Sequence, residues 1–298
     1  MDQIVNDWPF IGTISSECLN LDATLGCGQT FSWKRLDKGG WIGQAGTIPY
    51  AIFPASDQLS IYSPLGSLDE FQEYFQTTFD LEKVFNSFPS DDSILNQARL
   101  FSQKLRILKQ DPWETILSFL CSSAKPIIQI RKITQLLRRF YGKEVLPGFF
   151  SFPSPEDILT KGPSLLEQCK LGFRSDYVWK VASIFAKENK KFLSMLATAS
   201  TDTIRQTLLE LPGIGRKIAD CVLLFGYARM EVFPIDRWME RVLQTFYFNL
   251  LEKRKISKKE LLSFSSSYFG PFAGYAQQYL FYWSRSVFWK KGGLWEYQ

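Results

Sequence analysis

A lysine and an aspartate in the second half of the chain have the residue types that covalent catalysis requires. Lys217 ends the segment LPGIGRK, and Asp236 ends the segment FPID nineteen residues later. A lysine amine that has lost its proton is a nucleophile toward an electrophilic carbon. A nearby carboxylate can stabilise positive charge that develops during the attack, or shuttle the proton from the amine. The pair therefore indicates a site that forms a Schiff base through Lys217.

The glycines that precede Lys217 predict a helical hairpin. One helix should end at Pro212, the chain should turn at Gly213 and Gly215, and a second helix should begin near Gly215. The free N–H groups and the positive dipole end of this second helix suit a phosphate, and they also favour the uncharged form of the lysine. Many helical hairpins turn on glycine without binding anything, so these residues alone leave a purely structural turn open.

Asp236 has two compatible interpretations. It precedes a helix expected from Arg237 to Tyr247, and aspartate is a common N-cap, so it could serve only to start that helix. It could also cap the helix and take part in the reaction, because a capping carboxylate faces the mouth of the turn.

Two i, i+4 pairs could line a pocket beside the lysine. Cys221 lies four residues after Lys217 and should project from the same helix face. Gln277 and Phe281 form the second pair, and an amide beside an aromatic ring is suited to holding an extruded nucleobase. The alternative for Gln277 and Phe281 is ordinary helix surface and core.

The composition excludes several other mechanisms. The chain has 298 residues and no histidine, so neither a histidine-activated nucleophile nor a histidine-bound zinc is available. Its five cysteines are scattered without a CxxC motif, which indicates buried thiols and implies no metal or cofactor. The formal net charge of +5 permits a basic surface without making the chain a basic tail.

The hydropathy pattern bears on location. No apolar stretch approaches the ~20 residues that a membrane helix needs. The first residues, MDQIVNDWPFIG, lack the basic and apolar regions of a secretory signal. We therefore expect an intracellular protein that does not associate with membranes.

The chain is predicted to be α+β and mostly α, with two domains. Short alternating segments around Trp33, Trp41, Ile52 and Ile61 indicate an N-terminal antiparallel sheet domain, residues 1–92, in which Pro49 and Pro54 bound one strand. A helix is expected from Leu68 to Phe79. Helical periodicity begins at about residue 93, and residues 93–298 are predicted to form a helical domain. Within it, residues 146–155 carry three prolines and should form a surface loop.

The motifs together resemble the helix-hairpin-helix DNA glycosylase superfamily, whose members that cut the strand as well as removing the base carry a lysine at the position of Lys217. Blocks between residues 21 and 281 follow the same order as in eukaryote-type 8-oxoguanine DNA glycosylases; they read LDATLGCGQTFSW, DPWETILSFLCSS, LGFRSDYV, LPGIGRKIADC and FGPFAGYAQ. The resemblance implies a bifunctional glycosylase and lyase that acts on duplex DNA containing oxidised guanine, as a monomer, with Lys217 and Asp236 as its catalytic residues.

The resemblance also assigns the base pocket. It implies that Gln277 contacts the Watson–Crick edge of the damaged base, that Phe281 and Cys221 cover its two faces, and that the carbonyl of Gly28 accepts its N7–H. Oxidation at C8 turns N7 from an acceptor into a donor. A carbonyl at that point would bond the lesion and oppose normal guanine, at a cost of ~1–3 kcal/mol for the unpaired groups.

The residues that match the family's contacts to the opposite strand depart from its pattern. Ala124, followed by Lys125, stands where the family has an asparagine that fills the gap left by the flipped nucleotide. Gln129 replaces an arginine that reads the opposite cytosine, whereas Arg174 keeps the second such arginine. Trp238 replaces a histidine that contacts a phosphate. We therefore expect a weaker preference for cytosine than in standard family members.

Further phosphate contacts and two other functions remain open. Four basic residues could face DNA phosphates, namely Arg131, Lys132, Arg138 and Arg139. The same fold also serves glycosylases that remove alkylated bases with water as nucleophile, although those relatives lack an amine at the position of Lys217. A noncatalytic DNA-binding module would need only the glycine hairpin. Iron–sulfur relatives are excluded because no cysteine follows Cys221.

Overall fold

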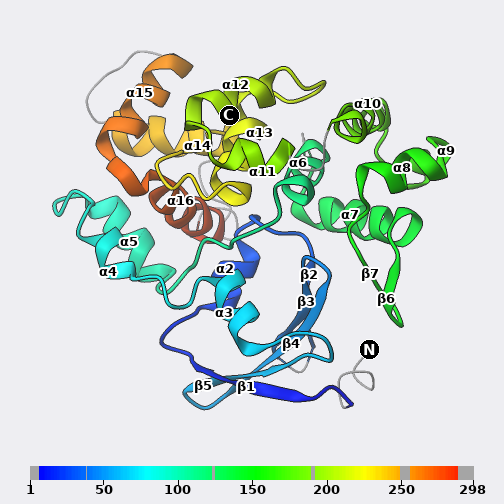
Figure 1. Ribbon diagram of the computed structural model, residues 1–298. Coiled ribbons are helices and arrows are strands. Elements are labelled where there is room, and N and C mark those ends of the chain that lie inside the picture. The colour runs from blue at the N-terminus through cyan, green and yellow to red at the C-terminus, as the bar shows by residue number, and fades with distance from the viewer. Residues whose placement is uncertain (1–6, 38, 123–124, 189–191, 249–255, 288–298) are drawn as a thin grey trace.

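A five-stranded antiparallel sheet forms one end of the molecule, and helices form the rest (Figure 1). The computed structural model describes residues 7–37, 39–122, 125–188, 192–248 and 256–287. The strand order is β1-β5-β4-β3-β2. The strands are β1 (Phe10–Ser15), β2 (Trp33–Arg35), β3 (Trp41–Ala45), β4 (Ile48–Ala55) and β5 (Gln58–Tyr62). This confirms the predicted α+β class, and it adds strand β1, which the sequence analysis did not identify.

Strand β4 corrects the prediction that two prolines bound it. Pro49 and Pro54 both lie inside the strand. Pro49 lies where β4 pairs with β3 alone, and Pro54 lies where it pairs with β5 alone. The missing N–H of each proline can therefore face the side that has no partner, so neither proline breaks the sheet.

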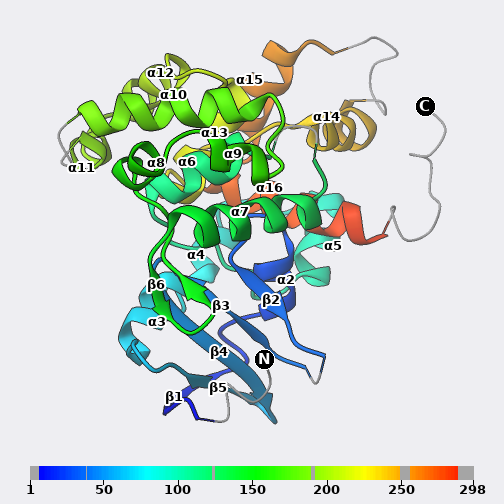
Figure 2. The same cartoon turned by 90° about the vertical axis from the view of Figure 1, so that its right-hand side faces the viewer.

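The helices stack above the sheet, and α7 lies between them and the strands (Figure 2). Their bounds are α2 (Leu21–Gly26), α3 (Leu68–Phe75), α4 (Leu81–Phe85), α5 (Ser93–Phe101), α6 (Pro112–Leu120), α7 (Ile127–Tyr141), α8 (Pro155–Lys161), α9 (Ser164–Gln168), α10 (Arg174–Lys187), α11 (Phe192–Ala197), α12 (Thr201–Leu209), α13 (Arg216–Gly226), α14 (Arg237–Leu243), α15 (Lys258–Tyr268) and α16 (Ala273–Val287). Among the described helices, none is long and apolar enough to cross a membrane.

Three expected segments differ from the structure. Helix α3 stops four residues short of Phe79 because Gln76 adopts a left-handed conformation, with φ of 50°. The expected loop at 146–155 contains part of a small hairpin, β6 (Glu144–Leu146) and β7 (Phe149–Phe150), and α8 begins at its last proline. Helix α14 ends at Leu243 and continues as a π-helical turn through Phe248. The two helices were predicted correctly in kind but not at their exact ends. The loop prediction missed two short strands.

Two large hydrophobic cores organise these elements, and a third, small cluster joins Trp8, Ile42 and Ala51. The larger one joins the helices and includes Ala23, Cys27 and Phe31 from the first part of the chain. The smaller of the two lies between the sheet and helices α2 and α3, and it includes Trp33 and Phe71. The division into domains at residue 92 stays a prediction.

A buried ion pair ties the sheet to the helices. Arg138 of α7 donates to Glu114 of α6 at 2.6 Å and to Ser32 Oγ, just before β2, at 3.1 Å. It also donates to the carbonyl of Phe150 in β7 at 3.0 Å. Only 6% of the Arg138 side chain is exposed. The expectation that Arg138 faces a phosphate is therefore wrong, because a guanidinium this deeply buried is neutralised by its own carboxylate.

Candidate active site

The predicted helical hairpin is present between α12 and α13. Gly213 has φ of +79°, and a Cβ built on it would lie 2.6 Å from the ring of Tyr177, so both backbone angle and space require glycine. Gly215 is the N-cap of α13 and has a φ of −96°, which any residue can adopt. A Cβ on Gly215 would meet no atom within 4 Å. Gly215 thus leaves open space in front of the first N–H groups of α13, where a phosphate can approach.

An ion-pair network fixes the start of α13. Asp220 is 1% exposed and accepts from Arg205 Nε at 2.9 Å and from Arg216 Nε at 2.7 Å. Arg205 also pairs with Asp202 of α12. This network joins the two helices of the hairpin and holds the first turn of α13 in place. The sequence analysis did not identify it, although an acid four residues after an arginine is a recognisable helix pair.

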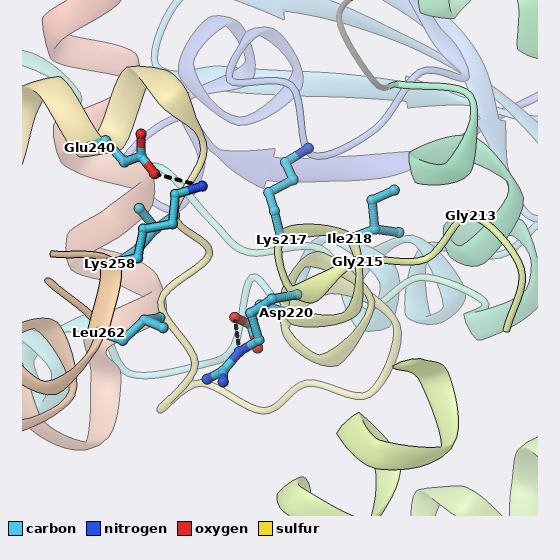
Figure 3. Close-up of a pocket in the computed structure, with 10 residues that line it drawn as sticks. Gly213, Gly215, Lys217, Ile218, Asp220, Glu240, Lys258 and Leu262 are labelled. Carbon is cyan, nitrogen blue, oxygen red and sulfur yellow. Dashed lines mark hydrogen bonds and ion pairs between the residues drawn. The ribbon is translucent and has the colours of Figure 1, made fainter. Parts of the chain in front are cut away.

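Lys217 projects from the first turn of α13 toward α6. Its amine donates to Ser122 Oγ at 3.4 Å and lies 5.1 Å from the centre of the Phe119 ring. Within the described part of the chain, Lys217 forms no ion pair with a carboxylate. Figure 3 shows its side chain pointing away from Asp220 and from the Glu240–Lys258 pair, at the edge of a cavity of about 370 Å³. Lys217 is a half-buried amine beside an aromatic ring and a hydroxyl.

Cys221 lies one turn further along α13, as predicted. Burial raises the pKa of its thiol to about 11, the positive charge of Lys217 opposes this rise, and the negative charge of Asp236 adds to it. The pKa of Cys221 therefore responds to both expected catalytic groups. The structure thus brings Lys217 and Asp236 each within electrostatic range of Cys221.

Asp236 caps α14, which confirms one of its two expected roles. Its Oδ1 accepts from the backbone N–H of Met239 at 2.8 Å, and the side chain is half-buried. Its negative charge also acts on Arg285 of α16: burial lowers the pKa of Arg285, and Asp236 opposes that change. The capping bond thus fixes a carboxylate whose charge acts on Cys221 of α13 and on Arg285 of α16.

Gly28, Phe281 and Arg285 lie close to one another. Gly28 has φ of +82°, and a Cβ there would lie 2.9 Å from Ile127 and 3.8 Å from the Phe281 ring. The guanidinium of Arg285 lies 5.1 Å from the centre of the same ring. Gln277 is 5% exposed, and its Oε1 accepts from Gln278 at 2.6 Å. The four residues expected to form a base pocket therefore lie on α16, on α13 and just after α2, but the amide oxygen of Gln277 is bonded within its own helix.

The residues expected to contact DNA lie on three separate segments. Lys125 is half-buried and donates to the carbonyl of Lys170 at 3.3 Å, and Gln129 is exposed in the first turn of α7. Arg174 begins α10 with its guanidinium 4.4 Å from the Phe173 ring. The indole of Trp238 donates to Ser284 Oγ at 2.7 Å, so this N–H does not point to a phosphate here. Ala124 lies outside the described residues.

Three residues of this site were missed by the sequence analysis. Ser122 and Phe119 contact the Lys217 amine, and Arg285 connects Phe281 to Asp236. Only Arg285 left a usable signal, because it continues the i, i+4 spacing of Gln277 and Phe281. Ser122 and Phe119 lie about one hundred residues before Lys217, where no sequence spacing links them to it.

The molecule belongs to the helix-hairpin-helix DNA glycosylases, because its hairpin places the amine of Lys217 in an apolar site. A family model described as 8-oxoguanine DNA glycosylase, N-terminal domain, matches residues 12–116. A probable N-glycosylase/DNA lyase from Methanothermobacter thermautotrophicus is 29% identical over 242 residues, which cover 73% of this chain and 75% of that protein.

Solved structures extend the likeness over nearly the whole chain. MBOgg1 in complex with a low-affinity DNA ligand superposes with a TM-score of 0.84 at 31% identity, covering 94% of this chain and 99% of that one. The 8-oxoguanine glycosylase/lyase of Clostridium acetobutylicum, bound to duplex DNA with cytosine opposite 8-oxoguanine, superposes with a TM-score of 0.82 at 27% identity and the same coverage. The chain belongs to the 8-oxoguanine DNA glycosylase/lyase family.

Proposed function

We propose that this protein excises 8-oxoguanine from duplex DNA and then cleaves the strand at the resulting abasic site. The observation that carries the proposal is the environment of Lys217, a half-buried amine with no carboxylate ion pair in the described structure, at the start of a phosphate-binding type of hairpin. Family membership supports the same function. The protein is expected to work wherever the cell keeps its DNA, in a nucleoid or a nucleus.

Lys217 acts as the nucleophile. Its neutral amine attacks C1′ of the flipped nucleotide, the bond from C1′ to the base breaks, and the base leaves with the electron pair and takes up a proton. Loss of a proton from the nitrogen and opening of the sugar ring give an imine between Lys217 and C1′. Removal of a proton from C2′ then expels the 3′ phosphate by β-elimination. Asp236 stabilises the positive charge on the sugar during the first step and shuttles protons.

The pocket residues recognise the base. Phe281 and Cys221 cover its faces, Gln277 binds its Watson–Crick edge, and the Gly28 carbonyl accepts the N7–H that only the oxidised base offers. Gln277 must exchange its bond to Gln278 for bonds to the base, which costs little because an amide bond is replaced by an equivalent one.

Borohydride trapping tests the mechanism. The wild-type protein, mixed with an 8-oxoguanine duplex and sodium borohydride, should form a covalent adduct that Lys217→Gln abolishes. Lys258→Gln is the matched control, because Lys258 lines the same cavity but pairs with Glu240; it should trap like the wild type. Base release without an adduct would contradict the lysine mechanism in favour of a water nucleophile. Absence of both would leave only DNA binding.

The preference for the base opposite the lesion tests whether the residues that differ from the family pattern, such as Gln129, weaken the reading of the opposite strand. Gln129 is exposed and carries no charge, so we expect comparable excision rates opposite all four bases. Single-turnover rates on four otherwise identical duplexes measure this. Strong selectivity for cytosine would show that Arg174 alone suffices for reading the opposite base.

A further inference from the structure

A second hollow, outside the site described above, lies between the sheet, helix α7 and the β6–β7 hairpin. Its volume is about 540 Å³. Figure 2 shows α7 crossing above strands β2 and β3, with β6 beside them. We call it the basic groove, because its walls carry the exposed cations Lys34, Lys132, Arg139 and Lys170.

The charge of the basic groove is not compensated. Its lining contains no aspartate or glutamate, and none of the four exposed cations forms an ion pair with a described residue. Arg138 also lines the groove, but Glu114 neutralises it. Exposed cations gathered without carboxylates raise the local positive potential and attract anions.

A neighbouring cavity shows that this charge is local. The cavity has a volume of about 640 Å³ and carries four carboxylates and one lysine, namely Asp111, Glu114, Glu156, Asp157 and Lys143. The buried Arg138–Glu114 pair stands between the two hollows, since Arg138 lines the basic groove and Glu114 lines its neighbour. The fold thus separates positive from negative side chains on either side of one ion pair.

The cations on α7 are spaced along one helix face. Lys132 and Arg139 lie seven residues apart, with Gln135 and Leu136 between them on the same face. At 1.5 Å per residue they are separated by roughly 10 Å along the helix axis, which corresponds to about three base-pair steps of a DNA strand. Lys34 reaches the groove from β2.

Short contacts connect the basic groove to the candidate active site. The carbonyl of Lys170 accepts from Lys125 Nζ at 3.3 Å, and the backbone N–H of Lys125 donates to the carbonyl of Ser122 at 3.2 Å. Ser122 is in turn hydrogen-bonded to Lys217. The segment that carries Lys170 in the groove wall is therefore in contact with the segment that carries Ser122 beside Lys217.

We propose that the basic groove binds phosphate esters, namely the phosphates of the DNA duplex beyond the lesion. The contact between the groove wall and Lys125, near the candidate active site, favours DNA as the source of these phosphates. This phosphate binding is independent of base sequence and lengthens the stretch of DNA that the protein covers. It rests on the proposed function only in taking DNA as the partner, because the binding itself requires no excision.

The test compares two variants that each lose three positive charges. Lys34→Gln/Lys132→Gln/Arg139→Gln alters the groove, and Lys83→Gln/Lys187→Gln/Lys259→Gln removes exposed lysines elsewhere. Binding of undamaged duplex is measured against salt concentration, with a short duplex and with one longer by about one helical turn, ~10 base pairs, on each side. Thermal unfolding shows whether each variant keeps the stability of the wild type.

With the long duplex, the negative slope of log K (the association constant) against log salt should be less steep for the groove variant than for the wild type, by about 2–3. Between 50 and 200 mM salt, the wild type should then lose about 40-fold more affinity than the groove variant. With the short duplex the groove variant should bind like the wild type, and the control triple variant should keep the wild-type dependence on duplex length.

A second arm distinguishes the source of the phosphate. Calorimetry with inorganic tripolyphosphate measures binding of a free anion to the wild type and to the groove variant. Loss of tripolyphosphate binding with an unchanged DNA slope would support the site but assign it to free phosphate compounds. Unchanged DNA slopes together with unchanged tripolyphosphate binding would overturn the proposal. Failure of the proposed function would appear instead in the trapping assay, which none of these measurements uses.

Discussion

Two neighbouring faces of helix α13 differ in whether their charged residues form ion pairs. On one face Asp220 is buried between Arg205 and Arg216, and every charge has a partner. On the next face, about a quarter turn away, Lys217 has a hydroxyl and an aromatic ring as neighbours and no carboxylate ion pair in the described structure. Figure 3 shows the two side chains pointing in different directions.

The difference separates stability from reactivity within one helix. A buried carboxylate with two guanidinium partners fixes the backbone of the first turn. An amine held on that fixed turn, with no carboxylate ion pair in the described structure, is placed for nucleophilic attack. The paired face, which carries Asp220, holds the unpaired face, which carries Lys217, in position. Substitutions on the paired face should therefore change stability, and substitutions on the unpaired face should change activity.

The largest effect is expected from the unpaired face. Lys217→Gln should lower the rate of base excision by on the order of 10⁴–10⁶, because it removes the nucleophile. Its free energy of unfolding should stay within about 0.5 kcal/mol of the wild type, because the side chain contributes no ion pair. Single-turnover kinetics and urea unfolding measure the two quantities. A large loss of stability would show that Lys217 serves the fold.

Asp236→Asn should separate the two roles of this residue. Asparagine caps a helix as well as aspartate does, so α14 should keep its stability. Loss of the negative charge should lower base excision by roughly 10²–10⁴. Single-turnover kinetics with a matched thermal denaturation measure this. Equal excision by the variant and the wild type would restrict Asp236 to capping.

The paired face should respond in stability. Asp220→Ala should cost about 3–5 kcal/mol in urea unfolding, because it leaves Arg205 buried without one of its carboxylates. Arg216→Ala provides the control, since half of that side chain is exposed and its pair should contribute only about 0–1 kcal/mol. Equal costs for both substitutions would contradict the assigned importance of burial.

The smallest effect concerns the thiol between Lys217 and Asp236. Because burial raises the pKa of Cys221 to about 11, the thiol stays protonated at neutral pH and should gain reactivity with iodoacetamide only as the pH rises toward that value. Mass spectrometry at a series of pH values measures the labelling, with half-exposed Cys18 as an internal control. Rapid labelling of Cys221 at pH 7 would indicate a thiolate paired with Lys217, and the two faces would then no longer differ.

Much of the fold followed from local patterns in the sequence. Asp111-Pro112 is a typical helix-start signal, and α6 begins at Pro112 with Asp111 as its cap. The glycine hairpin and the cap at Asp236 were also predicted correctly. Strand β1 was not, because it is stabilised by a distant partner: it pairs with β5 about fifty residues later. The β6–β7 hairpin was also missed, although its two short strands are neighbours in the sequence.

The sequence by itself determined where Lys217 stands on its helix, because turn glycines and helix caps act over a few residues. Only the tertiary structure decided what surrounds that lysine. Ser122 approaches it across 95 residues of chain, and Arg138, which the sequence presents as one more surface cation, is buried against Glu114. Such contacts depend on how the whole core packs, and residue type and spacing do not encode that locally.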